Sequence, residues 1–114
     1  MPTIDEIFRN IDSALREDPS RSQGTVAVFQ FDIGGEEAGI YQIVMRENEA
    51  YAHEGVQETP DCTISIDGEH FKKLMTGQLN PMMAVMSGKL KIQGNLGLAM
   101  RLNEILAAYQ KGDA

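Results

Sequence analysis

The chain has 114 residues with 17 acidic and ten basic side chains, one cysteine and a net charge of -7. This length suits a single domain over residues 1–114, and the lone Cys62 cannot form an internal disulfide. The excess of acid argues against nucleic-acid binding, which depends on Lys and Arg at phosphates. No apolar run reaches the roughly 18 residues of a membrane span, and the charged start is unlike a signal peptide, so we expect a cytoplasmic protein.

The N-terminal segment is predicted to be an amphipathic helix. Thr3 followed by Glu6 matches a capping box, and apolar residues recur behind it at helical spacing as far as Leu15. We expect the helix to end near Glu17, because Asp, Pro, Ser and Gly follow within residues 18–24.

Four strands are predicted next, from the alternation of apolar and polar residues. The first begins at Thr25, the second covers residues 40–46 and a weaker third covers residues 50–55. Their short connections indicate an antiparallel meander. A fourth strand covers residues 62–67 and places Cys62 on its inward face.

Two short helices are then predicted by their end signals. Asp67 is expected to cap a helix over residues 68–76. Asn80, followed by proline at the first helical position, is expected to begin a helix over residues 81–87. Each helix is followed by a glycine, which is typical of a helix C-terminus.

A fifth strand and a last helix complete the chain. The strand covers residues 89–93, and the helix runs from about Asn95 to Gln110 with one apolar stripe. The predicted order is therefore α-β-β-β-β-α-α-β-α. Strands in one block, with helices at the ends and in one crossover, indicate an α+β fold with helices packed on one sheet face.

Catalytic and metal chemistry finds little support in the residues. Cys62 is the only thiol, and an inward strand position favours a small buried hydrophobe. His53 and His70 are the only imidazoles, and neither belongs to a metal-ligand motif. Residues 94–97 follow a strand with two glycines but lack the spacing and lysine of a phosphate loop. We expect no catalytic residue, no metal site and no cofactor.

Methionine is concentrated in one part of the chain, where five of the seven lie within residues 75–100. Unbranched, polarizable methionine suits a surface that repacks around ligands of varied shape, although ordinary core filling is the alternative. The predicted helix over residues 81–87 is apolar nearly all round and is flanked by polar turns. These features favour an apolar cavity between a sheet and helices.

Two motifs occur together in residues 61–106. They are Gly-x-Leu-x-Pro at residues 77–81 and Met-x-Gly-Lys-Leu-Lys-Ile-x-Gly-x-x-x-x-Ala at residues 86–99. With them the chain closely resembles the sterol carrier protein type 2 family, also called non-specific lipid-transfer proteins. The resemblance implies a five-stranded, mostly antiparallel sheet with an apolar tunnel between sheet and helices. It also implies binding of fatty acids, fatty acyl-CoA, sterols or phospholipids.

The end of the chain differs from that of many eukaryotic relatives. Such members often end in a peroxisomal address such as SKL or AKL, whereas this sequence ends KGDA. Import by that route is not expected, which agrees with the cytoplasmic expectation.

We predict a non-catalytic lipid carrier with helices 68–76, 81–87 and 96–110 as the lid of its cavity. An accessory or docking domain that presents a lipophilic substrate to a partner enzyme is the alternative. For an anionic head group, the polar candidates are Arg16, Arg21 and Gln23, near the end of the first helix. The candidate walls are apolar residues of the lid and of the opposing strand face: Phe29, Phe31, Ile43, Ile64, Phe71, Leu74, Met75, Leu79, Met82, Met83, Met86, Met100 and Leu102.

Charge is unevenly distributed along the chain. Residues 1–61 carry a net charge of -9, and residues 62–114 carry +2. Basic residues of the second part belong to the elements around the expected cavity. If they share a surface, this half would face a membrane transiently while the acidic half stays in water. The five residues concerned are Lys72, Lys73, Lys89, Lys91 and Arg101.

Overall fold

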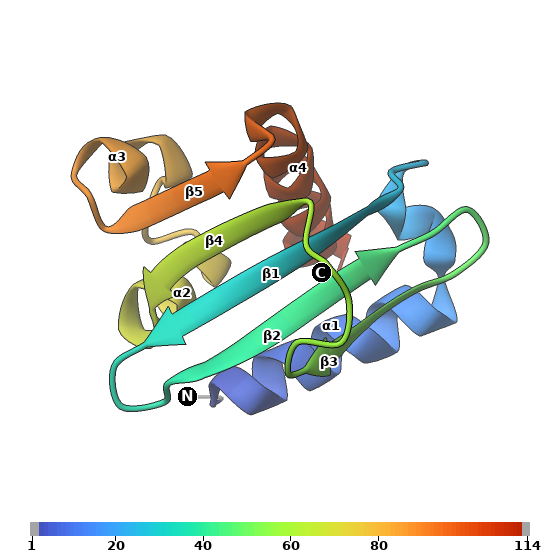
Figure 1. Ribbon diagram of the computed structural model, residues 1–114, viewed down its shortest axis with the longest axis horizontal. Coiled ribbons are helices and arrows are strands. Elements are labelled where there is room, and N and C mark those ends of the chain that lie inside the picture. Colours follow the sequence, from blue (N-terminus) through green and yellow to red (C-terminus); the bar gives the residue numbers. More distant parts are fainter. Residues whose placement is uncertain (1–2, 113–114) are drawn as a thin grey trace.

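The computed structural model describes residues 3–112, with side chains as far as residue 107. It has one sheet with α1, α2 and α4 on one face (Figure 1). The final dipeptide, on which the expectation about a peroxisomal address partly rests, lies outside the described residues. The helices are α1 (Ile4–Glu17), the 3-10 turn η1 (Pro19–Ser22), α2 (Gly68–Met75), α3 (Pro81–Met86) and α4 (Leu96–Gly112); the strands are β1 (Ala27–Gly34), β2 (Gly39–Met45), β3 (Ala50–Glu54), β4 (Cys62–Asp67) and β5 (Leu90–Gly94).

The strands lie in the order β3-β2-β1-β4-β5, which confirms the α+β class and the predicted five-stranded sheet. The first three strands form the predicted antiparallel meander, and β5 pairs antiparallel with β4. In contrast, β4 lies parallel to β1, with Cys62 opposite Phe29. Since β3 and β4 are separated by two strands, the chain must cross a sheet face between them. Figure 1 shows the loop of residues 55–61 passing over β2 and β1.

Gln42 fastens this crossing loop to the sheet. It lies in β2 between the core residues Tyr41 and Ile43, so its side chain faces away from the helices, and it is fully buried. Its Oε1 accepts the backbone N–H groups of Gln57 at 3.1 Å and Glu58 at 3.2 Å. Its Nε2 donates to the Glu58 carbonyl at 2.7 Å and also to the Gln30 side chain. The buried amide is therefore satisfied on both its oxygen and its nitrogen.

Two acidic side chains strengthen the same crossing. The Glu58 carboxylate pairs with Arg46 and accepts the Tyr51 hydroxyl at 3.0 Å. The hydrogen bond from Arg46, and then that from Tyr51, hold the pKa of the Glu58 carboxyl below its ordinary value. At the end of the loop, Asp61 accepts the backbone N–H of Val28 through Oδ2 at 2.8 Å. A hydrogen-bonded loop, and not a helix, thus lies over β2 and β1 on the outer face of the sheet.

Helix α1 is capped as expected and then joined to α2. Thr3 accepts the backbone N–H of Glu6 at 3.1 Å, which confirms the predicted cap. Beyond it, the Glu37 carboxylate accepts the N–H of Ile4 at 2.8 Å and pairs with Lys72 of α2. The hydrogen bond from Lys72, and then that from Ile4, lower the pKa of the Glu37 carboxyl. One carboxylate from the β1–β2 turn therefore connects both helices.

The predicted end signals of the later elements hold with one difference. Asp67 stands at the N-cap of α2, but its side chain makes no capping hydrogen bond. Asn80 accepts the N–H groups at the second and third positions of α3, as expected. Gly94 has a φ of +104°, and a Cβ there would lie 2.6 Å from the Asp61 carbonyl oxygen. Glycine is needed at that position because the chain turns sharply into α4 against the crossing loop.

Replacing the buried amide should destabilise the fold. We expect Gln42→Leu to lower the free energy of unfolding by about 1–3 kcal/mol, because loop N–H groups lose their acceptor. Gln93→Leu, at an exposed site on β5, should change it by less than about 0.5 kcal/mol. Urea unfolding followed by circular dichroism measures both, and equal effects would contradict the role of Gln42.

Candidate functional site

An apolar cavity lies between α1, η1, β2 and α4. Its volume is about 10 Å³, which is room for about one water molecule. Six apolar side chains line it together with the apolar part of Arg21: Ile11, Leu15, Ile43, Met45, Ile105 and Leu106. Of the predicted wall residues, Ile43 is in this lining. The other lining side chains come from α1, α4 and β2. Those on the two helices belong to the apolar stripes seen in the sequence, and these stripes were the signal that could have identified them.

The structure separates the three head-group candidates. Arg21 lies in η1 and lines the cavity. The Arg16 guanidinium pairs with Asp12 at 2.8 Å and lies 5.1 Å from the centre of the Tyr51 ring. Gln23 is exposed, with the backbone in the left-handed region at a φ of 55°. Among the three, the cavity is therefore reached by Arg21.

The 13 predicted wall residues divide by burial into three groups. Leu74, Met75 and Leu79 are half-buried and pack against the core. Side chains on α3 and at the beginning of α4 are exposed. The fully buried group is Phe29, Phe31, Ile43, Ile64, Phe71 and Leu102, and the exposed group is Met82, Met83, Met86 and Met100. The predicted walls thus span the whole depth of the helix layer, from the sheet to the surface.

Aromatic rings fill the helix layer on the α2 side. Phe8 of α1 stacks on Tyr41 at 4.3 Å and on Phe71 at 5.2 Å between ring centroids. Phe31 meets both Phe8 and Phe71 edge to face. Such stacked and edge-to-face pairs stabilise a packed core. Phe31 and Phe71 therefore belong to this aromatic cluster, while the cavity lies among aliphatic side chains nearer α4.

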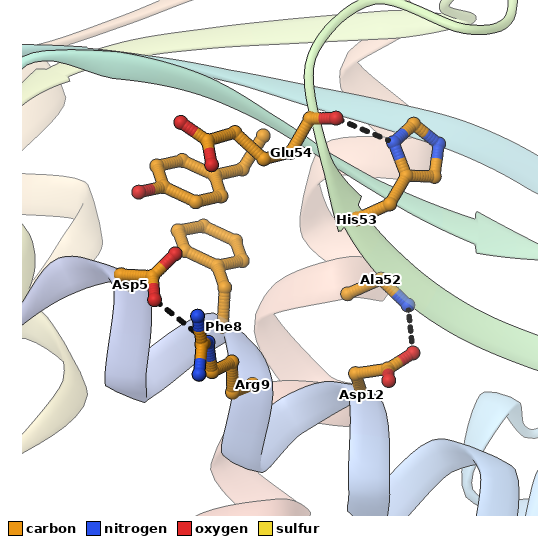
Figure 2. Close-up of a pocket in the computed structure, with 8 residues that line it drawn as sticks. Asp5, Phe8, Arg9, Asp12, Ala52, His53 and Glu54 are labelled. Carbon is orange, nitrogen blue, oxygen red and sulfur yellow. Dashed lines mark hydrogen bonds and ion pairs between the residues drawn. The ribbon is translucent and has the colours of Figure 1, made fainter.

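A second hollow, of about 220 Å³, lies where α1 meets β3 (Figure 2). Its polar side chains bind one another and the backbone. Asp5 pairs with Arg9 at 2.7 Å, and Asp12 accepts the backbone N–H of Ala52 at 2.9 Å. The contact from Asp12 covers part of the edge of β3, so these residues join α1 to the sheet. No group of three potential metal ligands occurs among the residues that the structure describes.

The single thiol is enclosed by the sheet. Cys62 is 1% exposed, opposite Phe29 in the parallel pair. Burial raises the pKa of the Cys62 thiol, and the charge of Asp61 adds to the rise. A buried thiol with a raised pKa is a poor nucleophile because little thiolate forms near neutral pH.

The arrangement of sheet and helices agrees with a known family. The sequence matches the SCP-2 sterol transfer family over residues 4–107, and the chain belongs to this family. It is 36% identical over 104 residues to the hydroxysteroid dehydrogenase-like protein 2 of Xenopus tropicalis, covering 90% of this chain and 24% of that protein. The chain therefore spans about a quarter of the length of this relative.

Solved structures share the fold. The sterol carrier protein domain 2 of Helicoverpa armigera has a TM-score of 0.76 at 29% identity, covering 92% of this chain and 86% of that one. Palmitated SCP2L2 from Aedes aegypti has a TM-score of 0.74 at 21% identity, covering 92% of this chain and 95% of that one. These findings confirm the resemblance carried by the two motifs. Within the described residues, no helix is long and apolar enough to cross a membrane.

The enclosure of Cys62 can be tested directly. In the native protein a small disulfide reagent should react slowly, because the thiol is reached through opening of the sheet. The rate should rise on the order of 100-fold or more in denaturant, and Cys62→Ala should abolish the reaction. Rapid stoichiometric labelling of the native protein would contradict the buried position.

Proposed function

We propose that this domain binds a fatty acid or fatty acyl-CoA without catalysing its conversion. The acyl chain lies between α1, β2 and α4, and its acidic head group lies beside Arg21. One observation carries the proposal: a cavity lined by six apolar side chains has one arginine, Arg21, in its lining. Sterols and phospholipids remain the other expected ligands of a site built from apolar walls.

The energetics favour an acyl chain even though the cavity must widen. Each buried methylene contributes about 0.8 kcal/mol, so a 16-carbon chain offers on the order of 12 kcal/mol before association and ordering costs. That gain is available to offset partial separation of α4 from the sheet. Half-buried Met75 and Leu79 stand at the margin of the same layer. Flexible methionine, in particular, can repack around a bound chain.

Arg21 supplies the charge that an anionic ligand requires. A guanidinium forms bidentate, charge-assisted hydrogen bonds with a carboxylate or phosphate. Arg16 is less suited to this role, because it does not line the cavity. The Aedes aegypti structure that shares this fold is described as palmitated, which supports a fatty acid as the first probe.

Charge at Arg21 should distinguish a fatty acid from a fatty alcohol. We expect Arg21→Gln to weaken binding of a fluorescent fatty acid about 10–100-fold, since a hydrogen bond to a charged group contributes about 1.5–3 kcal/mol. Affinity for the matching fatty alcohol should change by about twofold or less. Fluorescence titration of delipidated protein measures both ligands.

The matched control is Arg16→Gln, which removes the same charge from a side chain that does not line the cavity. It should leave both affinities within about twofold of wild type. Equal losses for acid and alcohol would contradict the role of Arg21. The absence of saturable binding of any fatty acid, acyl-CoA or sterol to the wild type would overturn lipid binding itself.

A second candidate function follows from the relatives of this chain. Its family segment forms about a quarter of hydroxysteroid dehydrogenase-like protein 2 from Xenopus tropicalis. In that role the domain would present a lipophilic substrate to an enzyme instead of carrying it between compartments.

Native mass spectrometry of gently purified protein separates the two functions. For a carrier we expect lipid at about one equivalent and no protein partner. A stable complex with an enzyme would instead favour the accessory role. The identity of the released lipid, measured on the same sample, names the ligand.

A further inference from the structure

Exposed apolar side chains lie on the two helices that flank the last strand of the sheet. It comprises Met82, Met83 and Met86 of α3 together with Leu96 and Met100 of α4, each between 63% and 84% exposed. Helix α3 lies at the beginning of β5 and α4 starts at its end, so both helices border this strand (Figure 1). Since β5 is the last strand of the sheet, we call this surface the β5 edge.

Helix α3 exposes most of its apolar surface. Ala84 is its one fully buried residue, while Val85 and all three of its methionines are exposed. Large apolar side chains gathered at one exposed place mark an interaction surface more often than scattered single ones do. Helix α3 contacts the core mainly through Ala84, so its exposed side chains are available to contact a partner.

The charge of the β5 edge is opposite to that of the chain as a whole. Residues 70–103 contain no aspartate or glutamate, although the chain has 17 acids, and they contain five of the ten basic residues. Lys89 immediately before β5, Lys91 in β5 and Arg101 in α4 are exposed. Among the side chains that the structure describes, none of these three bases takes part in an ion pair. Apolar and cationic groups thus belong to the elements of one edge, and the first acid that follows them, Glu104, lies one turn further along α4.

The kind of partner follows from this combination. A second copy of the chain would bring like charges together at the interface. The apolar side chains protrude, and a fluid lipid interface accepts protruding side chains without a matching groove. Apolar residues beside lysine and arginine are the combination that binds bilayers containing anionic lipid.

We propose that the β5 edge docks this protein on the surface of an anionic lipid bilayer. The methionines and Leu96 enter the boundary between head groups and acyl chains, and Lys89, Lys91 and Arg101 contact lipid phosphates. Docking is peripheral and reversible, and it orients the acidic remainder of the molecule toward water. The proposal does not rest on lipid carriage, because the cavity beside Arg21 and the β5 edge share no residue.

Co-sedimentation with vesicles tests the docking surface. Wild-type protein should bind vesicles of phosphatidylcholine with phosphatidylglycerol, bind phosphatidylcholine alone much more weakly, and dissociate at high salt. Lys89→Gln and Lys91→Gln should each weaken binding about fivefold, as expected for one basic residue near an anionic surface. The double variant Met83→Gln with Met86→Gln should weaken it about tenfold or more. All these positions are exposed, so circular dichroism and the urea midpoint should remain near wild type.

Matched controls carry the same changes elsewhere. Val56→Gln alters an apolar side chain that is 59% exposed on the crossing loop. Arg9→Gln removes one positive charge from the exposed side of α1. Both variants should bind vesicles as well as wild type. Equal losses in the controls, or binding that is insensitive to salt and to every β5-edge variant, would overturn the proposal.

Two further readouts separate membrane docking from lipid carriage and from self-association. Fatty-acid affinity, measured without vesicles, should be unchanged in the lysine variants. Loss of vesicle binding with intact fatty-acid binding therefore supports the docking surface, whereas the absence of vesicle binding in wild type overturns docking and leaves lipid carriage standing. Size-exclusion chromatography should show no concentration-dependent dimer, and a dimer lost in the methionine variant would overturn the proposal in favour of a second copy.

Discussion

The parallel pairing of β4 with β1 is the constraint on which the rest of the structure depends. Antiparallel neighbours can be joined by a tight turn, but parallel strands need a connection that returns along the sheet. Here the crossing follows β3 and passes over two strands as an irregular loop. Gln42 makes this arrangement stable, because its amide supplies the hydrogen bonds that an adjacent strand or a helix would otherwise provide.

The loop crosses one face of the sheet, and α1, α2 and α4 lie together on the other face. That helix layer has two parts of different character. On the α2 side, Phe8, Phe71 and Tyr41 stack into a solid cluster, whereas near α4 aliphatic side chains leave a small cavity beside Arg21. The proposed acyl-chain site lies in this second part, which is lined by side chains of α1, β2 and α4. The β5 edge lies outside both parts and keeps its apolar side chains in solvent.

Much of this fold could be predicted because its local signals agree with one another. The caps at Thr3 and Asn80 and the alternation in four of the strands each indicated the element that forms. Asp67 shows the limit of such signals, since it occupies the cap position without making the capping bond. The head-group candidates show another limit. Arg16 and Arg21 are only five residues apart, yet Asp12 binds Arg16 on α1, and Arg21 of η1 lines the cavity.

By itself the sequence determined the element order, the apolar face of each element and, through two motifs, the family. It did so because hydrophobic period and end signals are local properties of the chain. The tertiary structure decided what covers each apolar face. It buried Phe29 and Leu102, left Met83 and Met86 in solvent, and placed Gln42 under a loop that is distant in sequence. Periodicity identifies which side chains share a face, but burial depends on which other segment packs there, and that is set by long-range strand pairing.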